Sequence, residues 1–327
     1  MNLYPLIKLL SDGKPHTGTE LGDQLAISRT AVWKQIQKLP ELGLEYTTDK
    51  QLGYCLLEPL DLLDATALAE QIKSLDSFHD AKLETLPLVG STNTHLLDFA
   101  NAGQNIHKHF VTAEMQVQGK GRRGRQWMSP FASSLSSTLG WHFDGSAQKL
   151  QGLSLAIGVA LCRCLQKYGF PGTGLKWPND VYLNGSKLGG ILIEITGDLA
   201  GPCILVVGYG VNFSRPPTFD ASLIDQSFTF LSDHTEKLPS RNQLVADLFI
   251  EVARVLESYA ITGFQPHVEA WNQLHIWKGK KVHLISASGQ EEVLLGDVNP
   301  LGELNVQAAD GSWRSINSGE ISLRLSE

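Results

Sequence analysis

The segment Ile204–Val211 constrains the fold of this 327-residue chain more strongly than any other. It contains no charged residue and is rich in β-branched and aliphatic side chains. A strand this apolar is covered on both faces, so it is expected in the centre of a sheet. Strand-like and helix-like patterns alternate around it from residue 65 to 270. The sequence therefore predicts a mixed α/β domain over 65–270.

Residue spacing predicts further elements of this domain. Strand-like runs and apolar residues at helical spacing follow one another, and Ser91 is a suitable helix N-cap. The predicted strands are 83–89, 110–114 and 189–195, and the predicted helices follow Ser91 and cover 150–165 and 244–259.

Residues 1–60 predict a separate helical unit. Apolar residues recur at helical spacing from Leu3, Thr17 opens a capping-box pattern, and Ser28 is a good N-cap for a third helix. Two strand-like segments follow, around the turn 49–53. The order of three helices and a hairpin is that of a winged helix-turn-helix. Pro40 cannot lie inside a helix without losing a hydrogen bond, so we expect the third helix to end or bend before it.

Charge on the third helix indicates DNA binding. Between Gln24 and Pro40 the chain has basic residues and no acidic one. An exposed helix N-terminus of this kind meets base edges and phosphates in helix-turn-helix proteins. The alternative is a packing module with a solvated basic face. The residues expected to face DNA are Ser28, Arg29, Thr30 and Lys34.

Residues 271–327 predict a third unit. The helical signal ends near 275, and short strand-like runs alternate with turn signals such as Ser288-Gly289 and Asp310-Gly311. This spacing is typical of a small β-barrel of the SH3-like kind.

Composition restricts the classes of partner. The formal net charge of −7 argues against general coating of nucleic acid, so DNA contact is expected on one face only. Cys162 and Cys164 point to different faces of a predicted helix and suit buried free thiols in a reducing compartment better than a metal site. No signal peptide is evident, and the apolar stretch 153–161 is too short to cross a bilayer. We expect a cytoplasmic protein with no membrane contact.

The segment Gly119–Arg125 carries four permanent cations and three glycines. Exposed backbone N–H groups beside guanidinium groups form an anion cradle, which predicts an anionic ligand. A solvated basic hairpin or a nucleic-acid patch is the alternative. The segment is neither a Walker A loop nor a dinucleotide-binding fingerprint, because no Gly-Lys-Ser/Thr follows and it opens no predicted helix. Its cations suit an enzyme that transfers a nucleotidyl group.

Five short segments, in this order, resemble those of the biotin–protein ligases. Together with the N-terminal unit they resemble the bifunctional bacterial form, which also represses the biotin biosynthesis operon. The resemblance covers essentially the whole chain. The segments are 91–93, 114–127, 176–180, 187–194 and 208–212.

The resemblance implies a two-step reaction. Biotin and ATP, with Mg²⁺, give biotinyl-5′-AMP, and the biotinyl group passes to a lysine of the biotin carboxyl carrier protein of acetyl-CoA carboxylase. Biotinyl-5′-AMP is then also the corepressor: the loaded protein forms a homodimer and binds operator DNA.

The resemblance also assigns site residues. Lys187 and Arg122 are the expected catalytic residues, since fixed cations offset the repulsion between a carboxylate and a phosphate. The expected biotin-binding residues are Ser91, Thr92, Asn93, Gln116, Lys120, Gly121, Arg122 and Lys187. The expected ATP-binding or adenylate-binding residues are Arg122, Arg123, Arg125, Trp127, Lys176, Asn179, Asn212 and Phe228.

Several of these residues have a plain alternative. From spacing alone Lys187 is a solvated loop lysine, and Trp127 is either core or an adenine platform. Asn179 and Asp180 either organise a turn around Pro178 or lie near Mg²⁺. Lys120 stands where the family often has Arg, and Phe228 where it usually has Trp, so retention of the intermediate is open.

Two other functions compete with the ligase–repressor. One is a biotin-sensing repressor without catalysis, against which Lys187 and Arg122 argue. The other is a lipoate-type acyl ligase, against which the basic segment and the N-terminal unit argue.

Overall fold

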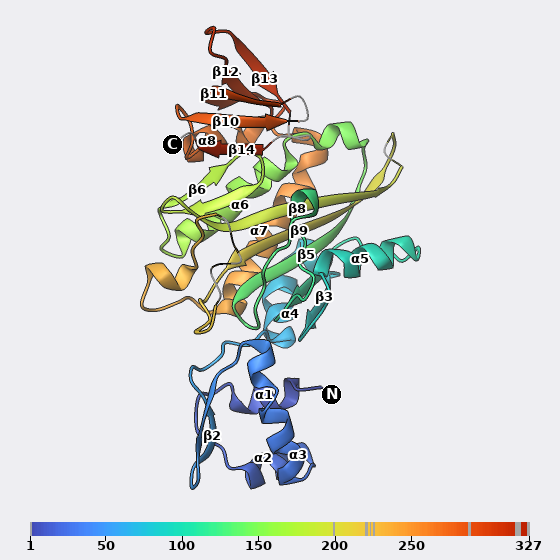
Figure 1. The fold of residues 1–327 in the computed structure, drawn as a ribbon. Helices are drawn as coiled ribbons and strands as arrows, with labels where there is room; N and C mark the ends of the chain where they lie inside the picture. The colour runs from blue at the N-terminus through green and yellow to red at the C-terminus, as the bar shows by residue number, and fades with distance from the viewer. Residues whose placement is uncertain are drawn as a thin grey trace.

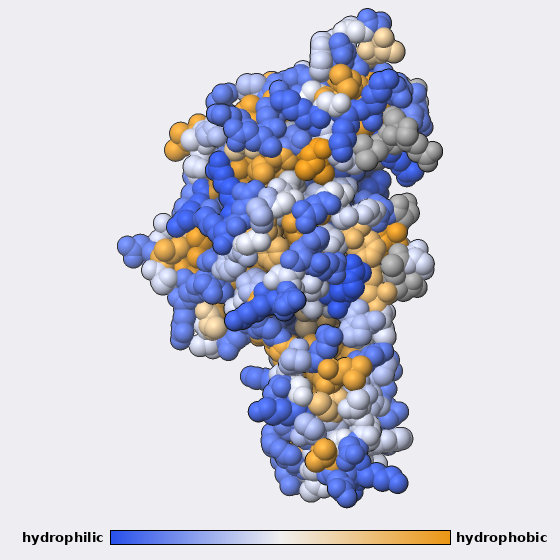
Figure 2. All heavy atoms as spheres, turned by 90° about the vertical axis from the view of Figure 1, so that its left-hand side faces the viewer, coloured by the Kyte–Doolittle hydropathy of each residue, from blue (hydrophilic) through white to orange (hydrophobic). Residues whose placement is uncertain are grey.

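The structure is a computed structural model that describes residues 2–198, 200–219, 222, 224, 226–286, 289–317 and 322–325. The chain ends lie far apart: the N-terminus belongs to a narrow helical unit at one end, and the C-terminus to a small sheet at the other (Figure 1). A broad layer of sheet and helices lies between them. The space-filling view shows the N-terminal unit projecting from this broader body, with a mainly hydrophilic surface (Figure 2).

The N-terminal unit has the predicted order of three helices and a hairpin. Thr17 Oγ accepts a hydrogen bond from Glu20 N at 3.2 Å, and Ser28 Oγ accepts one from Ala31 N at 3.2 Å, so both predicted caps are confirmed. The third helix ends before Pro40, which lies in a separate 3₁₀ turn. The elements are α1 (Tyr4–Leu10), α2 (Gly18–Leu25), α3 (Arg29–Ile36), η1 (Leu39–Leu42), β1 (Tyr46–Asp49) and β2 (Gly53–Leu56).

A seven-stranded sheet forms the centre of the molecule, in the order β3-β4-β5-β9-β8-β7-β6. All neighbours are antiparallel except β3 and β4. The predicted central strand is confirmed, because β9 pairs with β5 on one side and with β8 on the other. The strands are β3 (Lys82–Leu86), β4 (His109–Ala113), β5 (Ser134–Phe143), β6 (Thr173–Lys176), β7 (Asp180–Leu183), β8 (Ser186–Gly197) and β9 (Cys203–Asn212).

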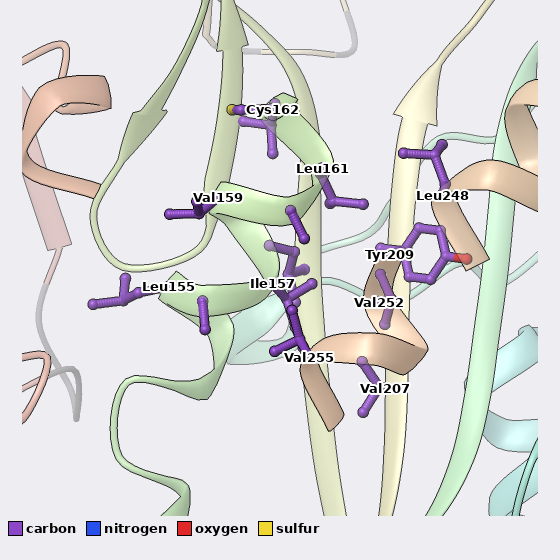
Figure 3. Close-up of a cluster of buried hydrophobic side chains, with 14 of the residues drawn as sticks. Leu155, Ile157, Val159, Leu161, Cys162, Val207, Tyr209, Leu248, Val252 and Val255 are labelled. Carbon is purple, nitrogen blue, oxygen red and sulfur yellow. The ribbon is translucent and has the colours of Figure 1, made fainter. Parts of the chain in front are cut away.

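Helices cover both faces of this sheet, which explains why β9 is apolar throughout. On one face Val207 and Tyr209 of β9 pack against α6 and α7 (Figure 3). On the other face Val206 packs with Leu96 of α5. The helices are α4 (Ala65–Lys73), α5 (Thr92–Asn101), α6 (Leu153–Lys167), α7 (Arg241–Thr262) and α8 (Val268–Leu274), and the 3₁₀ turns are η2 (Asp76–Phe78), η3 (Arg122–Gly124), η4 (Ala147–Leu150), η6 (Leu231–His234) and η7 (Gln265–His267).

The C-terminal strands form a five-stranded antiparallel sheet in the order β13-β12-β11-β10-β14. This confirms a strand-rich C-terminal unit. Among the described strands, β13 and β14 are the two edges and no ladder joins them, so closure into a barrel is not seen. The strands are β10 (Lys281–Ser286), β11 (Gly289–Val298), β12 (Leu304–Gln307), β13 (Trp313–Ile316) and β14 (Ser322–Leu325).

A buried ion pair fixes the junction between the N-terminal unit and the central sheet. Arg241, at the start of α7, pairs with Glu114, at the end of β4, and neither side chain is more than 1% exposed. Arg241 N also donates to Asp61 Oδ2 at 2.7 Å, and Leu63 N donates to Glu114 Oε1 at 2.6 Å. Phe131 of the central part belongs to the core of the N-terminal unit. The N-terminal unit therefore docks on the central domain through buried contacts of the connecting segment and of Phe131.

All four cysteines are free thiols, and Cys162 is so buried that its pKa rises to about 12, as expected of an inert core thiol. No helix within the described ranges is long and apolar enough to cross a membrane.

Candidate active site

A cavity of about 700 Å³ opens beside the central sheet and gathers the predicted site residues. The start of α5, the basic segment, the β6–β7 turn, β8, β9 and the C-terminal unit all contribute to it. Among the described residues that line it, seven are cationic and Asp180 is the one acid. This excess of positive charge makes the cavity suited to a polyanion. The cations are Lys120, Arg122, Arg123, Arg125, Lys176, Lys187 and Arg324.

The hairpin between β7 and β8 positions Lys187. Asn184 and Gly185 have φ values of 48° and 86°, which form a tight turn that brings β8 back beside β7. Lys187 Nζ then lies 2.8 Å from Asp180 Oδ1, with both side chains about 15% exposed. Its backbone is also fixed, because its N–H donates to Ser227 O and its C=O accepts from Thr229 N. Lys187 is thus held in the cavity wall and is not a freely solvated loop lysine.

The basic segment is a closed loop with Arg122 at its tip. Trp127 N donates to Gly119 O at 2.8 Å, and Gly121 N donates to Arg125 O at 2.7 Å. Arg122 reaches across the cavity and donates from Nη1 to Asn179 Oδ1 at 3.3 Å. Burial lowers the pKa of the Arg122 guanidinium, although Asp180 opposes this effect. A bound anion would therefore stabilise the charged form of the Arg122 guanidinium.

A neutral polar pocket forms one end of the cavity at the start of α5. Ser91, Thr92 and Asn93 are all buried, with at most 4% exposure. Thr92 N and Oγ1 both donate to Gln116 Oε1, at 2.8 and 3.1 Å. Asn93 Nδ2 donates to Glu194 Oε2 at 2.8 Å. Ser91 both caps α5 and lines the cavity, so a structural and a binding role are compatible.

Thr138 supports this pocket from behind, and Gly208 and Gly210 of β9 line the cavity. The segment 208–212 was selected from the sequence, but neither glycine was assigned to the site and Thr138 was not selected. Thr138 Oγ1 contacts Thr92 Oγ1 and Asn93 Oδ1, each at 2.7 Å. A Cβ on Gly208 would lie 2.1 Å from Asn93 Oδ1, and one on Gly210 would lie 2.7 Å from the Trp127 ring. Both positions therefore require glycine, which explains the Gly-Tyr-Gly pattern of β9. The alternation of small residues in β9 was the signal that could have assigned these two glycines to the site.

Aromatic side chains also line the cavity. Trp127 packs on the backbone of Gly210, and its indole Nε1 is buried with no hydrogen-bond partner within the described part of the chain. The rings of Phe228 and Phe219 are in contact, with 5.4 Å between their centroids. The backbone of Phe228 pairs with that of Lys187 in an isolated parallel β-bridge. Asn212 Nδ2 donates to Thr229 O at 3.0 Å and holds this segment against β9. These rings give the cavity an apolar aromatic part.

The cavity offers a poor site for a metal held by protein alone. In the ranges that the structure describes, no group of three His, Cys, Asp or Glu side chains converges. Asp180 already contacts Lys187 at 2.8 Å and has Lys176 at 4.0 Å. A magnesium ion bound chiefly through substrate phosphates is compatible with this arrangement.

The predicted DNA-binding residues lie together on the N-terminal unit. All four are exposed: Arg29, Thr30 and Lys34 on α3, and Ser28 directly before it. Val32 and Ile36 of the same helix are buried. Ser28 also caps the helix. The exposed side of α3 therefore combines cations with hydroxyl groups.

The sequence as a whole matches known proteins over almost its full length. A model described as the HTH domain matches residues 3–55, and one described as the biotin/lipoate A/B protein ligase family matches residues 85–212. The bifunctional ligase/repressor BirA of Salmonella typhimurium is 35% identical over 322 residues, which cover 98% of this chain and 97% of that protein. This chain belongs to the bifunctional ligase/repressor family. The protein of the same name from Escherichia coli K12 is 34% identical over 322 residues, which cover 98% of this chain and 97% of that protein.

A solved biotin protein ligase has a similar fold over three quarters of this chain. The structure of biotin protein ligase from Aquifex aeolicus in complex with biotin and ATP superposes with a TM-score of 0.64 at 25% identity. It covers 75% of this chain and 99% of that one.

Proposed function

We propose that this protein is an ATP-dependent biotin–protein ligase and a biotin-responsive repressor. The observation that carries the catalytic part is the single cavity that joins a buried neutral pocket to a cluster of seven described cations around Lys187. The neutral pocket suits the uncharged ureido group of biotin. The cations suit the biotin carboxylate and the phosphates of ATP, which repel one another in water.

In the first step a biotin carboxylate oxygen attacks the α-phosphorus of ATP. A new bond forms between this oxygen and phosphorus, the bond to the β-phosphate oxygen breaks, and pyrophosphate leaves. Lys187 and Arg122 are positioned to offset the approach of the two anions and the charge that grows in the transition state. Mg²⁺ enters with ATP and neutralises its phosphates.

In the second step an acceptor lysine attacks the carbonyl carbon of biotinyl-5′-AMP. The bond to the phosphate oxygen breaks, AMP leaves with the electron pair, and the amine loses a proton. The mixed anhydride is already activated, so the protein mainly supplies position and exclusion of water. The acceptor is the biotin carboxyl carrier protein of acetyl-CoA carboxylase.

The site assignments follow from this scheme. Biotin contacts Ser91, Thr92, Asn93, Gln116, Lys120, Gly121, Arg122 and Lys187. ATP and the adenylate contact Arg122, Arg123, Arg125, Trp127, Lys176, Asn179, Asn212 and Phe228. The indole Nε1 of Trp127 is buried without a hydrogen-bond partner among the described residues, and this supports a place beside a ligand. A bound ligand would supply the missing acceptor.

The repressor function rests on the N-terminal unit. Residues 1–60 bind operator DNA through α3, residues 65–270 hold biotin and ATP, and residues 271–327 form an SH3-like barrel built on the five-stranded sheet. Biotinyl-5′-AMP is the corepressor, and it favours a homodimer because the dimer binds it more tightly than the monomer does.

One experiment separates this function from its two competitors. The protein is incubated with ATP, Mg²⁺ and either biotin or lipoate, and the acyl-AMP is identified by mass spectrometry. We expect biotinyl-5′-AMP with biotin only. Lipoyl-AMP would favour the lipoate ligase, and no adduct with tight biotin binding would favour the non-catalytic repressor.

A further inference from the structure

Trp277 brings the C-terminal unit to the wall of the active-site cavity. It follows α8 in the connection to β10, is 7% exposed, and lines the cavity. The backbone beside it joins the edge strand of the central sheet, because Ile276 N donates to Leu175 O at 3.1 Å. Trp277 is therefore held next to the end of β6, where Lys176 lies.

Two aromatic rings contact the ammonium group of Lys176. Its Nζ lies 4.3 Å from the centroid of the Trp277 ring and 5.8 Å from that of Tyr182. The rings meet edge to face with 6.4 Å between centroids. Distances below about 6 Å are in the range of cation–π attraction, and Trp is the strongest partner. The Lys176 side chain is 14% exposed, so this attraction acts in a largely dry environment.

Without the Trp277 ring, the carboxylate of Asp180 would draw the Lys176 ammonium onto itself. Asp180 Oδ2 lies 4.0 Å from Lys176 Nζ, while its Oδ1 is engaged by Lys187 at 2.8 Å. A lysine side chain has many rotamers and is not fixed by a distant carboxylate. If Lys176 moved onto Asp180, it would neutralise its own charge and compete with Lys187 for its partner.

We propose that Trp277 is a positioning residue for the nucleotide substrate: its ring holds the Lys176 ammonium towards the polyphosphate of ATP. The affinity for ATP, and not the affinity for biotin, then depends on the contact between the C-terminal unit and β6. This inference rests on the proposed function. Tyr182 contributes the second ring, but Trp277 makes the closer contact and comes from outside the central sheet.

The test is biotin-dependent exchange of pyrophosphate into ATP by the full-length protein, with ATP and biotin varied separately. Trp277→Leu removes the ring, and we expect its KM for ATP to rise about tenfold, in line with a desolvated cation–π contact. Trp277→Phe keeps a ring, and we expect a rise of about threefold or less. The KM for biotin should stay within twofold in both variants. Trp313→Leu, at an exposed tryptophan of the same unit, is the matched control and should leave both KM values unchanged.

A double-mutant cycle separates positioning from packing. Once Lys176→Gln has removed the ammonium, Trp277→Leu should add less than twofold to the KM for ATP. Equal increases in the KM values for ATP and biotin, an equally damaging Trp277→Phe, or full additivity with Lys176→Gln would each overturn the inference. If the unaltered protein shows no exchange, the proposed function itself fails; normal exchange with an unchanged KM for ATP in Trp277→Leu rejects only the role of Trp277.

Discussion

Lys187 and Asp180 form a close ion pair across the β7–β8 hairpin, with 2.8 Å between Nζ and Oδ1. Asp180 faces Gly190 in the register of the two strands, so the space beside the pair is open towards the cavity. Asp180 thus orients the lysine, and an incoming anion shares the ammonium with it.

Replacing Lys187 by Ala should remove most adenylation activity. The substitution deletes a fixed cation beside the developing charge, and such a loss costs about 100-fold or more in rate. Biotin-dependent pyrophosphate exchange measures this step. Lys187→Arg is the matched control and should recover only part of the activity, because the planar guanidinium does not reproduce a compact ammonium. Exchange at the wild-type rate in Lys187→Ala would exclude the proposed catalytic role.

Replacing Arg122 by Gly should release the intermediate. Arg122 crosses the cavity to Asn179, so its loss opens one wall and removes a partly buried cation. We expect the dissociation rate of biotinyl-5′-AMP to rise at least about tenfold, a change of about 1.4 kcal/mol. A chase with unlabelled biotin reports this rate, and an unchanged rate would contradict the assignment.

Alanine at Gly208 and at Gly210 should affect different substrates. The added Cβ at 208 displaces Asn93 in the neutral pocket, whereas the one at 210 displaces Trp127. We expect Gly208→Ala to weaken biotin binding and Gly210→Ala to weaken ATP binding, each by about tenfold or more. Calorimetric titration with each ligand distinguishes the two effects, and the variants serve as controls for each other. Equal losses for both ligands in both variants would refute the division of the cavity.

Stability should fall in mild acid because of His275. Burial lowers the pKa of this imidazole to about 4, while an unfolded histidine titrates near 6.5. The unfolded chain therefore takes up a proton first as the pH falls, and the stabilising contribution, complete above about pH 6.5, decreases towards pH 4. At pH 5 the loss is on the order of 2 kcal/mol.

Thermal unfolding at pH 7.5 and pH 5 measures this effect. His275→Gln cannot take up the proton and should show a smaller decrease in Tm between the two pH values. His142→Gln, at a histidine that is about half exposed, is the control and should behave like the unaltered protein. A decrease in Tm as large in His275→Gln as in the unaltered protein would disprove the prediction.

Deleting residues 1–60 should abolish DNA binding and leave a ligase of lower stability. The deletion removes α3 and also uncovers Phe131 and Ala132, which pack in the core of the N-terminal unit. We expect biotinyl-5′-AMP formation to persist and Tm to fall by several degrees. Gel-shift, exchange and calorimetric measurements on the shortened protein check the three parts. Retained operator binding would refute the division into domains.

The fold was predictable from sequence wherever local signals were strong. The caps at Thr17, Ser28 and Ser91 and the apolar strand at 204–211 marked elements that the structure confirms. Strand β5 was missed because its serines and threonines look like a loop, although they are buried in the sheet. The hydroxyl groups of Ser136, Ser137 and Thr138 find partners outside β5, which no local pattern reveals.

The sequence predicted which residues line the cavity, but not which residues they contact. The short segments named Lys187, Arg122 and Asn93, and all three line one cavity. The contacts of Asn93 with Glu194 and Thr138, and of Lys176 with Trp277, join residues far apart in the sequence, which sheet pairing or docking of the C-terminal unit brings together. Long-range pairing of this kind has no signature in a single chain.

Buried contacts hold the N-terminal unit on the central domain. Leu63 N donates to Glu114 Oε1, Arg241 N donates to Asp61 Oδ2, and Phe131 packs in the core of the N-terminal unit. Turning the unit would break these contacts and leave the buried Arg241–Glu114 pair with fewer hydrogen-bond partners, which is costly. In a dimer the distance between the two α3 helices is then set by how the central sheets meet and not by slack in the connecting segment. The spacing of the operator half-sites would then have to match the fixed distance between the two α3 helices. Inserting half a helical turn of DNA between the half-sites would leave one α3 helix with no major groove to enter.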